Sequence, residues 1–464
     1  MINKRADDAP TVVILGALDT KGAEITYLQE AIRRMGVKTL LMDVSIGGEP
    51  ALRPDISSRE IAAAGGGDIR EIRSSRDTGR VTPIIIKGAI HKALALHAAG
   101  LLDGIISIGG ASGTTIGTTV MKGLPFGVPK LMLSSTASMP AYAAEYIGTK
   151  DIALMHSVVD IAGLNDLLKD VLVRAGGAIS GMALAKAAAA ARETSRVIAA
   201  GPEPVDQPRK PLVAITEFKF SEGCCRILRD SLTARGYDVI AFHAQGIGDQ
   251  ALDELLDQGW FDGVLDIVPS GLCEELLGGN RAAGPRRLLA AGERGIPMII
   301  TPSGFDLLSC GPVERRDRDD PLWKARGLAG RQLFVQDSFR VQARTSKEEV
   351  KAVAREAAAR LNKARGPVTF LIPRKGWSNL SSPGGILYNP EIDQVLAEEL
   401  RNGLHSSHVQ LVELDMELNS DEFAQLVLEK FEKMMVLREA QRGKGTKAQR
   451  QRKKRKGGEK DSTT

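Results

Sequence analysis

The sequence predicts an α/β protein of two Rossmann-like lobes, each with a parallel sheet, related by an internal duplication. Short apolar runs rich in valine and isoleucine alternate with segments of helical periodicity, as buried parallel strands and their crossover helices do. The 49 glycines and the 4% aromatic content of the 464 residues are typical of a fold with many tight strand–helix turns. Three strand–loop pairs recur in the same order in the two halves, which is the reason to infer duplication.

The first lobe, residues 10–200, begins with the strand Thr11–Gly16, a helix over Ala23–Met35 and a second strand at Val37–Asp43. This order is a βαβ crossover, and its first loop lies at the carboxyl end of the first strand. Further along the lobe we expect a helix within Val81–Gly100, strands at Leu102–Ile108 and Pro129–Ser134, and an alanine-rich helix at Ala185–Ala200.

The second lobe, residues 212–435, follows a proline-rich linker at 201–211 and repeats the pattern of the first. Its run Phe261–Val268 corresponds to Leu102–Ile108, and Gly295–Thr301 corresponds to Gly127–Ser134. Chance similarity is the alternative, because all α/β units share this rhythm, but the repeated Asp-Gly and Gly-Xaa-Pro pairs favour duplication. The other expected elements are strands at Leu212–Thr216, Tyr237–His243 and Val368–Ile372, helices at Lys347–Ala364 and Phe423–Met435, and a loop from Pro373 to Tyr388.

The C-terminal tail, residues 436–464, is basic. From Arg438 to the last residue the net charge is +8, so the rest of the chain carries −3. Because the tail has almost no apolar residues, we expect it to be disordered. It is either a nuclear-import or weak RNA-binding arm or a solubilising tail, and the mildly acidic body gives no reason to expect nucleic acid.

The compartment that the composition favours is the cytoplasm, with the nucleus as an alternative because of the basic tail. No apolar run approaches the length of about 18 residues that spans a membrane, and residues 1–10 are polar, so no membrane association is expected. The four cysteines contain no Cys-x-x-Cys pair, which argues against a zinc site or a disulfide framework.

The glycine-rich segment Gly109–Thr115 is the sharpest chemical feature. It follows a buried strand, and its glycines let the backbone approach an anion without a side-chain clash. We expect a helix over Ile116–Lys122, whose N-terminal N–H groups would face the same space and bind phosphate. The predicted nucleotide-binding residues here are Gly109, Gly110, Ser112, Gly113, Thr114 and Thr115. The segment lacks both the Gly-Lys-Ser/Thr of a P-loop and the dinucleotide spacing, and a tight turn without ligand is the alternative.

The turn Gly16–Gly22 lies at the carboxyl end of the first strand, in the same predicted crevice. Asp19 is the predicted magnesium ligand, because hard cations take carboxylate oxygens. Thr20 would donate to phosphate and Lys21 would neutralise its charge. The alternative is that Asp19 and Thr20 only cap the following helix. With the flanking glycines, the predicted cofactor-binding residues are Gly16, Asp19, Thr20, Lys21 and Gly22.

Three further residues at strand ends belong to the predicted site. Asp43 ends the second strand, where acidic residues often accept a ribose hydroxyl. A carboxylate that only supports the loop is the alternative for Asp43. Ser135 and Thr136 follow the strand that ends at Ser134. Nucleophilic chemistry has little support, and His156 and His243 are the only weak acid–base candidates.

Long segments carry a resemblance to a known family. They read GALDTKGAEITYLQEAIRRMGV, SIGGASGTTIGTTVMKGLPFGVPKLMLSSTAS, GTKDIALMHSVVDIAGLN, FHAQGIG, FDGVLDIVPSGLCEELLGG and RGPVTFLIPRKGWSNLSSPGGILYNPE. Over about residues 10–435 the chain resembles the tomato mosaic virus resistance-like family of ATP-binding proteins, whose activity is largely unknown. The resemblance implies ATP with Mg²⁺ bound by the first lobe, and a homodimer. The plant relative acts by binding a viral replication protein, an activity that belongs to its own lineage and is not carried over, so a protein partner of this chain is left open.

The sequence departs from that family's pattern mainly in the second lobe. A His-Asn pair is replaced by Gln336 and Asp337, an Asp-Ala by Ser381 and Ser382, and a histidine by Glu417. In the first lobe, a glycine is replaced by Met139. The nucleotide-binding segments of the first lobe are intact, so any catalysis by the second lobe is more affected than nucleotide binding.

Two functions of different classes follow from these residues. One is a nucleotide-responsive binding or regulatory protein. The other is an enzyme that acts on a small phosphorylated or carboxylated metabolite in a cleft between the lobes, with or without ATP turnover. We also expect the lobes to be unequal, since Glu274 and Glu275 follow the matching turn of the second lobe and would repel a triphosphate.

Overall fold

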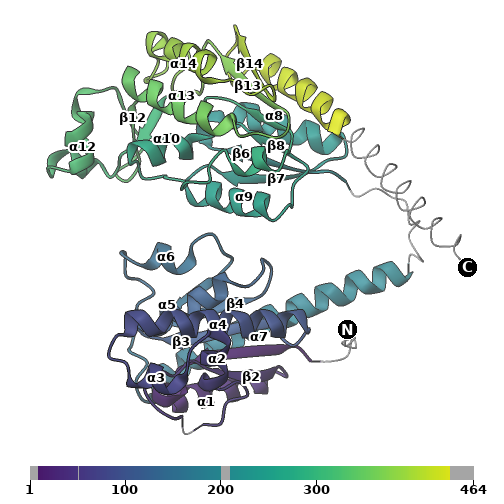
Figure 1. Cartoon of the computed structure of the whole chain (residues 1–464), viewed down its shortest axis with the longest axis vertical. Coiled ribbons are helices and arrows are strands. Elements are labelled where there is room, and N and C mark those ends of the chain that lie inside the picture. Colours follow the sequence, from purple (N-terminus) through teal and green to yellow (C-terminus); the bar gives the residue numbers. More distant parts are fainter. Residues whose placement is uncertain (1–8, 51, 200–209, 439–464) are drawn as a thin grey trace, which may run out of the picture. The chain divides into compact units, whose positions relative to one another are not determined.

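The computed structural model of the chain describes residues 9–50, 52–199 and 210–438 (Figure 1). It contains two compact units, Met1–Gln207 and Pro208–Thr464. Each unit has its own parallel sheet with helices on both faces, so the predicted fold class is confirmed. Most of the expected linker at 201–211 and of the basic tail at 436–464 lies outside the described residues.

The sheet of the first unit has five parallel strands in the order β2-β1-β3-β4-β5. Their bounds are β1 Thr11–Gly16, β2 Lys38–Asp43, β3 Gly104–Gly109, β4 Lys130–Ser134 and β5 Ala153–His156. Four of them match the predicted strands to within two residues. The edge strand β5 was not predicted, because its apolar run ALM is shorter than those of the central strands, and the structure buries none of its residues.

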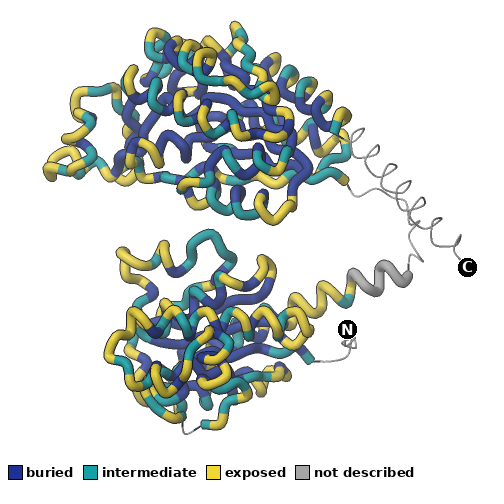
Figure 2. The backbone as a smooth tube through the Cα atoms, in the orientation of Figure 1, coloured by how far each residue is buried: buried dark blue, intermediate teal, exposed yellow. Residues whose placement is uncertain are grey.

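Helices cover both faces of this sheet, and alternate residues of each strand point to opposite faces. The helices are α1 Leu18–Arg34, α2 Ser58–Gly65, α3 Ile69–Ser74, α4 Thr78–Ala98, α5 Ala111–Lys122, α6 Ala143–Ile147 and α7 Asp166–Ala199. One core lies between the sheet and α1 and α7, and the other between the sheet and α2 to α5. Buried strand residues form the dark centre of the unit in Figure 2.

Helix α7 is long and apolar enough, over residues 166–192, to satisfy the length and composition of a membrane span. One side of the helix packs on the sheet, where Leu168, Leu172 and Ile179 are fully buried against strand residues such as Ile106. Other apolar side chains of the same stretch, such as that of Leu167, are exposed, and 39% of the stretch is buried. A single helix of this length and composition is weak evidence for a membrane span, because core helices of soluble proteins share both properties.

The sheet of the second unit has six parallel strands in the order β7-β6-β8-β9-β13-β14. The first five of these positions repeat the strand order of the first unit, as an internal duplication predicts. The bounds are β6 Leu212–Glu217, β7 Asp238–His243, β8 Gly263–Asp266, β9 Met298–Ile300, β13 Val368–Pro373 and β14 Val409–Leu414.

The second unit also contains elements that the sequence reasoning missed. A small antiparallel sheet, β10-β12-β11, follows β9 in the chain, with strands at Leu307–Ser309, Leu333–Val335 and Val341–Arg344. Helix α14 at Pro390–Gly403, capped by the Asn389 side chain, and strand β14, which extends the sheet, follow the predicted loop in a stretch for which no element was predicted. The other helices are α8 Glu222–Ala234, α9 Ile247–Asp257, α10 Ser270–Leu277, α11 Ala290–Glu293, α12 Pro321–Arg326, α13 Lys347–Leu361 and residues 421–438, with short 3-10 turns at Lys219–Ser221, Val313–Asp317 and Leu328–Gly330.

Strand order fixes where a ligand site is expected in the first unit. The chain runs from β1 outward to β2 and then returns to β3 on the other side of β1. Loops at the carboxyl ends of β1 and β3 therefore turn to opposite faces of the sheet and leave a crevice between them. The two segments singled out in the sequence, Gly16–Gly22 and Gly109–Thr115, contain these two turns and the first residues of the helices that follow them.

Candidate functional site

A pocket of about 510 Å³ occupies the crevice between β1 and β3. Its volume is within the usual range for small-molecule sites. The β1–α1 turn lines it from Gly16 to Lys21, and the β3–α5 turn lines it from Ser107 to Gly113. The loop after β2 adds apolar side chains, and Asp160 adds a carboxylate from the segment after β5. The structure thus brings together the two segments that the sequence reasoning placed in one crevice.

The N-terminus of α5 opens onto this pocket, and it begins five residues earlier than expected. The helix starts at Ala111 instead of Ile116, so most of the predicted loop is the first turn of the helix. Gly110 is the N-cap residue, and no side chain caps the helix. The first N–H groups of a helix have no intrahelical partner, so those of α5 are available to an anion in the pocket.

Two glycines of this turn have different roles. A Cβ at Gly109 would lie 2.9 Å from the Cα of Gly113, so the backbones of β3 and α5 meet closely only because residue 109 is glycine. A Cβ at Gly113 would meet only the Ile108 carbonyl oxygen at 3.5 Å, an ordinary contact. Gly109 is therefore needed for the turn itself, whereas Gly113 keeps the pocket open above α5.

The hydroxyls of this turn were all predicted to face the ligand, and for two of the three this is wrong. Thr114 is fully buried, and its Oγ1 donates to the Gly110 carbonyl at 2.7 Å. Thr115 Oγ1 donates to the Ala111 carbonyl at 3.0 Å. Because α5 starts early, both threonines belong to the helix and bond to its own backbone. Thr115 is exposed, as Ser112 is, but of the three hydroxyl residues only Ser112 lines the pocket.

Ser135 and Thr136 follow β4 and do not line the pocket directly. Ser135 is beside it, since a Cβ at Gly110 would lie 3.7 Å from the Ser135 Oγ. That hydroxyl also donates to Asp160 at 3.4 Å. Thr136 does not line the pocket, and its Oγ1 is hydrogen-bonded to the Tyr146 hydroxyl at 3.2 Å. Of the two, Ser135 is therefore the residue within reach of the site.

Asp19 does not cap α1, so the alternative that Asp19 is only a helix cap is wrong. The N-cap of α1 is Ala17, and no side chain caps the helix. The Asp19 Oδ2 instead accepts the backbone N–H groups of Gly47 and Gly48, at 3.2 and 3.0 Å. Its Oδ1 is buried and has no hydrogen-bond partner among the described residues. A buried carboxylate oxygen without a donor is costly unless a ligand or ion completes it.

Lys21 and Thr20 both line the pocket, and the side chain of each already makes a hydrogen bond within the protein. The Lys21 ammonium donates to the Ile161 carbonyl, and Thr20 Oγ1 donates to the Ala17 carbonyl at a long 3.5 Å. Lys21 thus attaches α1 to the segment that carries Asp160. Gly16 lines the pocket, and a Cβ there would meet the Ile25 side chain at 2.5 Å, whereas Gly22 has open space around it and does not line the pocket.

Asp43 supports the loops of the site and does not line the pocket. It is fully buried. Its Oδ1 accepts the backbone N–H groups of Leu18 and Ser45, at 3.2 and 3.0 Å, and the Ser45 hydroxyl. Because it is buried, Asp43 does not reach a ribose in the pocket as predicted, and it has the alternative role of supporting the loop. Asp43 fixes the start of α1 against the loop after β2.

Asp160 is the site residue that the sequence reasoning missed. It is exposed, lines the pocket, and accepts the Ile161 N–H at 2.8 Å through Oδ1. The only available signal was its place in the segment GTKDIALMHSVVDIAGLN, which resembles the family. Because β5 was not recognised as a strand, nothing indicated that the following segment returns to the crevice.

The two carboxylates Asp19 and Asp160 are the residues in the pocket that suit a divalent cation. Magnesium in nucleotide sites typically takes one or two carboxylates, with phosphate oxygens and water as its other ligands. Within the described residues there is no group of three or more His, Cys, Asp or Glu side chains that would hold a metal alone. The donor set therefore suits a cation that arrives with a phosphorylated ligand. Neither His156 nor His243 lines this pocket.

The matching position in the second unit is closed. A Cβ at Gly271, in the first turn of α10, would meet Ala283 at 2.3 Å, and Ser270 to Leu272 are buried. Glu274 is fully buried and accepts the Ser309 N–H at 2.9 Å, and burial raises its pKa to about 7. Glu275 accepts the Gly284 N–H at 2.9 Å. We expected the charge of Glu274 and Glu275 to repel an anion from the N-terminus of α10. The structure shows that packing already closes this helix end.

Two family models match the chain. The model described as "Uncharacterised protein family (UPF0261) N-terminal domain" matches residues 10–188, and the one for the C-terminal domain of the same family matches residues 210–435. A UPF0261 protein of Clostridium tetani is 34% identical over 424 residues, which are 91% of this chain and 98% of that protein. A UPF0261 protein of Rhizobium meliloti is 31% identical and covers 89% of this chain and 96% of its own length.

The predicted resemblance to tomato mosaic virus resistance proteins is also confirmed. The ToMV resistance protein Tm-1(GCR237) of Solanum lycopersicum is 29% identical over 91% of this chain, which spans 56% of the tomato protein. Among solved structures, a UDP-N-acetylglucosamine 2-epimerase from Rickettsia bellii covers 63% of this chain and 79% of its own, at 8% identity and a TM-score of 0.22. A TM-score this low gives no basis for an inference about function.

Proposed function

The chain belongs to the uncharacterised protein family UPF0261, and we propose that it binds ATP with Mg²⁺ in the pocket between β1 and β3 of its N-terminal domain. The observation that carries the proposal is the uncapped N-terminus of α5 beside the unsatisfied Asp19 Oδ1 in one pocket. The helix N-terminus favours an anion, and the carboxylate oxygen favours a cation. A metal–phosphate ligand satisfies both.

The phosphates would lie at the N-terminus of α5. Gly110 and Gly113 present backbone without side chains there, and Ser112 supplies a hydroxyl donor. Backbone N–H groups and the helix dipole stabilise negative charge at such a position. Because the pocket contains only one lysine, and its ammonium already donates to a carbonyl, the backbone would supply most of the phosphate contacts.

Asp19 and Asp160 would hold the Mg²⁺ that accompanies the phosphates. The bound ion neutralises phosphate charge and orients the polyphosphate. Asp19 is already fixed by the Gly47 and Gly48 amides through Oδ2, so its Oδ1 is preorganised as a ligand. A carboxylate held in this way loses little side-chain entropy on binding the ion.

The nucleoside would lie against the apolar part of the same pocket. Val44, Ile46 and Ile116 line it, and they come from the loop after β2 and from α5. A flat aromatic base is well suited to an apolar wall of this kind. The pocket therefore has a polar end for phosphates and an apolar end for a base.

We propose a binding or regulatory role in preference to catalysis. Asp19 contacts the loop after β2, and Lys21 contacts the segment after β5. A nucleotide bound to the first turn of α1 would thus order two surface loops at once, which a protein partner or a second copy of the chain would then recognise. The residues that line the pocket include no histidine or cysteine, so no specific observation favours an enzyme.

Calorimetric titration of the full chain with MgATP tests the proposal. We expect saturable binding that weakens at least about tenfold in Asp19→Asn, because the variant loses the charge that faces the metal. Asp166→Asn is the matched control, since Asp166 is a fully exposed carboxylate on α7. Equal affinity of the wild type and Asp19→Asn for MgATP would contradict the assignment, as would equal affinity for ATP with and without Mg²⁺.

A further inference from the structure

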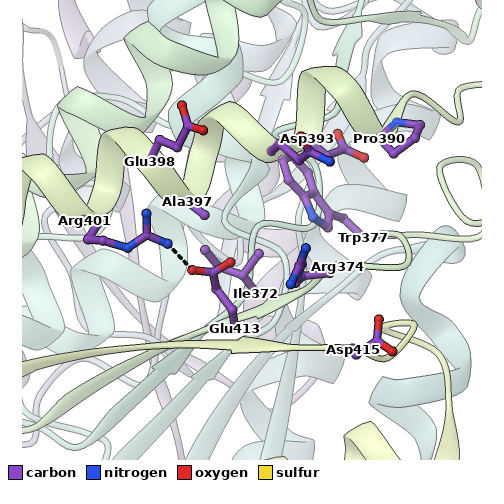
Figure 3. A pocket seen from close by; sticks show the side chains of 11 residues that line it. Ile372, Arg374, Trp377, Pro390, Asp393, Ala397, Glu398, Arg401, Glu413 and Asp415 are labelled. Carbon is purple, nitrogen blue, oxygen red and sulfur yellow. Dashed lines mark hydrogen bonds and ion pairs between the residues drawn. The ribbon is translucent and has the colours of Figure 1, made fainter.

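A second pocket, of about 290 Å³, lies in the C-terminal unit at the carboxyl ends of β13 and β14 (Figure 3). Helix α14 forms one wall, and Arg374 and Trp377 from the loop after β13 form another. This is the Pro373–Tyr388 loop that stood out in the sequence, and the nucleotide proposal does not use it. The pocket is about half as large as the one in the first unit, so it suits a smaller molecule.

Most charges that line this pocket are already paired. Arg401 pairs with Glu413, as the dashed line in Figure 3 marks. Asp415 pairs with Lys375 at 3.0 Å. The buried Asp393 pairs with Arg344. These pairs balance one another, so they leave little net charge for a ligand to neutralise.

Two opposite charges on the lining have no partner within the described residues. Arg374 and Glu398 are both exposed, and neither makes an ion pair or a side-chain hydrogen bond. Figure 3 shows Glu398 on α14 and Arg374 on the strand side of the pocket, well apart in the view. A ligand that satisfied both would need an anionic end and a cationic end.

The indole of Trp377 adds a directional donor. Trp377 is 1% exposed and lines the pocket. Its indole nitrogen makes no hydrogen bond among the described residues and is not one of the buried polar atoms without a partner, so the N–H is accessible from the pocket. Indole N–H groups of largely buried tryptophans usually have a partner. Figure 3 shows the indole nitrogen on the side of the ring that faces Arg374. The unpartnered N–H and the guanidinium therefore converge on one region, as donors for a carboxylate do.

We propose that this pocket binds a small zwitterion, whose carboxylate is held by Arg374 and the Trp377 indole N–H and whose ammonium is held by Glu398. Arginine is well suited to a carboxylate because its N–H groups match the two oxygens in a planar fork. Glu398 then distinguishes an amino acid-like ligand from a simple carboxylate. This site is independent of the nucleotide pocket, so either proposal stands if the other fails.

Calorimetry of the full chain with three probes tests the assignment: δ-aminovalerate, valerate, which lacks the ammonium, and pentylamine, which lacks the carboxylate. We expect δ-aminovalerate to bind, valerate to bind about tenfold more weakly, and pentylamine not to bind. Arg374→Gln should abolish binding of both carboxylates, and Glu398→Gln should reduce δ-aminovalerate to the affinity of valerate. The matched control is Arg365→Gln, an exposed arginine outside the pocket with the same change in charge.

Tryptophan fluorescence gives a second readout. The chain has three tryptophans, and Trp377→Phe retains Trp260 and Trp323, so ligand-induced emission changes should disappear in that variant. If Trp377→Phe does not fold, Arg374→Gln still decides the question, because Arg374 is exposed. The proposal is overturned if pentylamine binds as tightly as δ-aminovalerate, if Arg374→Gln binds like the wild type, or if none of the probes binds at tens of millimolar.

Discussion

A substitution at Gly113 can test the predicted phosphate site without disturbing the fold. Its neighbour in the same turn, Gly109, cannot accept a Cβ without contact with the Gly113 backbone at 2.9 Å. Gly113 itself has room for one and also lines the pocket. A side chain at position 113 would therefore extend into the space above the N-terminus of α5 without disturbing the turn.

We expect Gly113→Val to lower MgATP affinity at least about tenfold while the chain remains folded, because the valine occupies the space that phosphates need. Gly177→Val is the control, since Gly177 is also helical, a Cβ added there would meet no atom within 4 Å, and it lies on α7 outside the pocket lining. Calorimetry and circular dichroism measure the two effects. Unchanged affinity in a folded Gly113→Val would exclude α5 as the phosphate site.

At the scale of elements, the first turn of α1 organises the site. Asp43, at the end of β2, accepts the Leu18 N–H. Asp19 accepts a backbone N–H of the loop after β2, and Lys21 donates to a carbonyl of the segment after β5. Three loops at the carboxyl edge of one sheet are therefore fixed through three residues in the first turn of one helix. These loops come from β1, β2 and β5, which are not all neighbours in the chain, so only the sheet order brings them together.

Asp43→Ala should lower the free energy of unfolding by about 1–3 kcal/mol, because it leaves the Leu18 and Ser45 N–H groups without their acceptor. Urea unfolding followed by circular dichroism measures this loss. If Asp43 only supports the loop, the ratio of the affinities for ATP and 2′-deoxy-ATP should be the same in the variant as in the wild type. A normal stability together with a changed ratio would instead restore Asp43 as a ribose ligand.

At the scale of the whole molecule, the two units have the same strand order but unequal sites. The helix that follows β3 opens onto a pocket, whereas α10, which follows the matching strand β8, has a buried first turn. We therefore expect one MgATP per chain by calorimetric titration. Two equivalent sites per chain would contradict the closure of the second unit, and Gly113→Val should remove the single site.

The second unit should make the stability of the protein depend on pH. Burial raises the pKa of Asp253, Glu274 and Asp393 to about 7. Their unfolded pKa values are near 4, so the folded chain binds more protons than the unfolded chain between about pH 4 and 7. The free energy of unfolding contributed by these groups therefore falls as the pH rises through that window.

Asp253→Asn tests this pH dependence at one residue. Asp253 Oδ2 is buried without a hydrogen-bond partner among the described residues, so its ionised form is costly. The variant should be more stable relative to wild type at pH 8 than at pH 5, by about 1–3 kcal/mol. Denaturant titrations at the two pH values measure the difference. The same relative stability at both values would show that Asp253 ionises as it does in the unfolded chain.

The sequence by itself determined the central strands, the two-unit architecture and the segments that meet in the crevice. Continuous apolar runs such as Thr11–Gly16 are visible without tertiary context, because a strand buried on both faces needs no alternation. The position of the crevice follows from the order of βα units in a parallel sheet. Long family segments added the resemblance, which the comparisons confirm.

Only the tertiary structure decided which side chains of those segments face the pocket. The early start of α5 turns Thr114 into the helix, and the packing of α1 against the loop after β2 buries Asp43. Asp160 joins the site because β5 extends the sheet, although the apolar run of β5 is only three residues long. Side-chain direction depends on helix starts and on contacts between distant segments. Local residue patterns leave both of these undetermined.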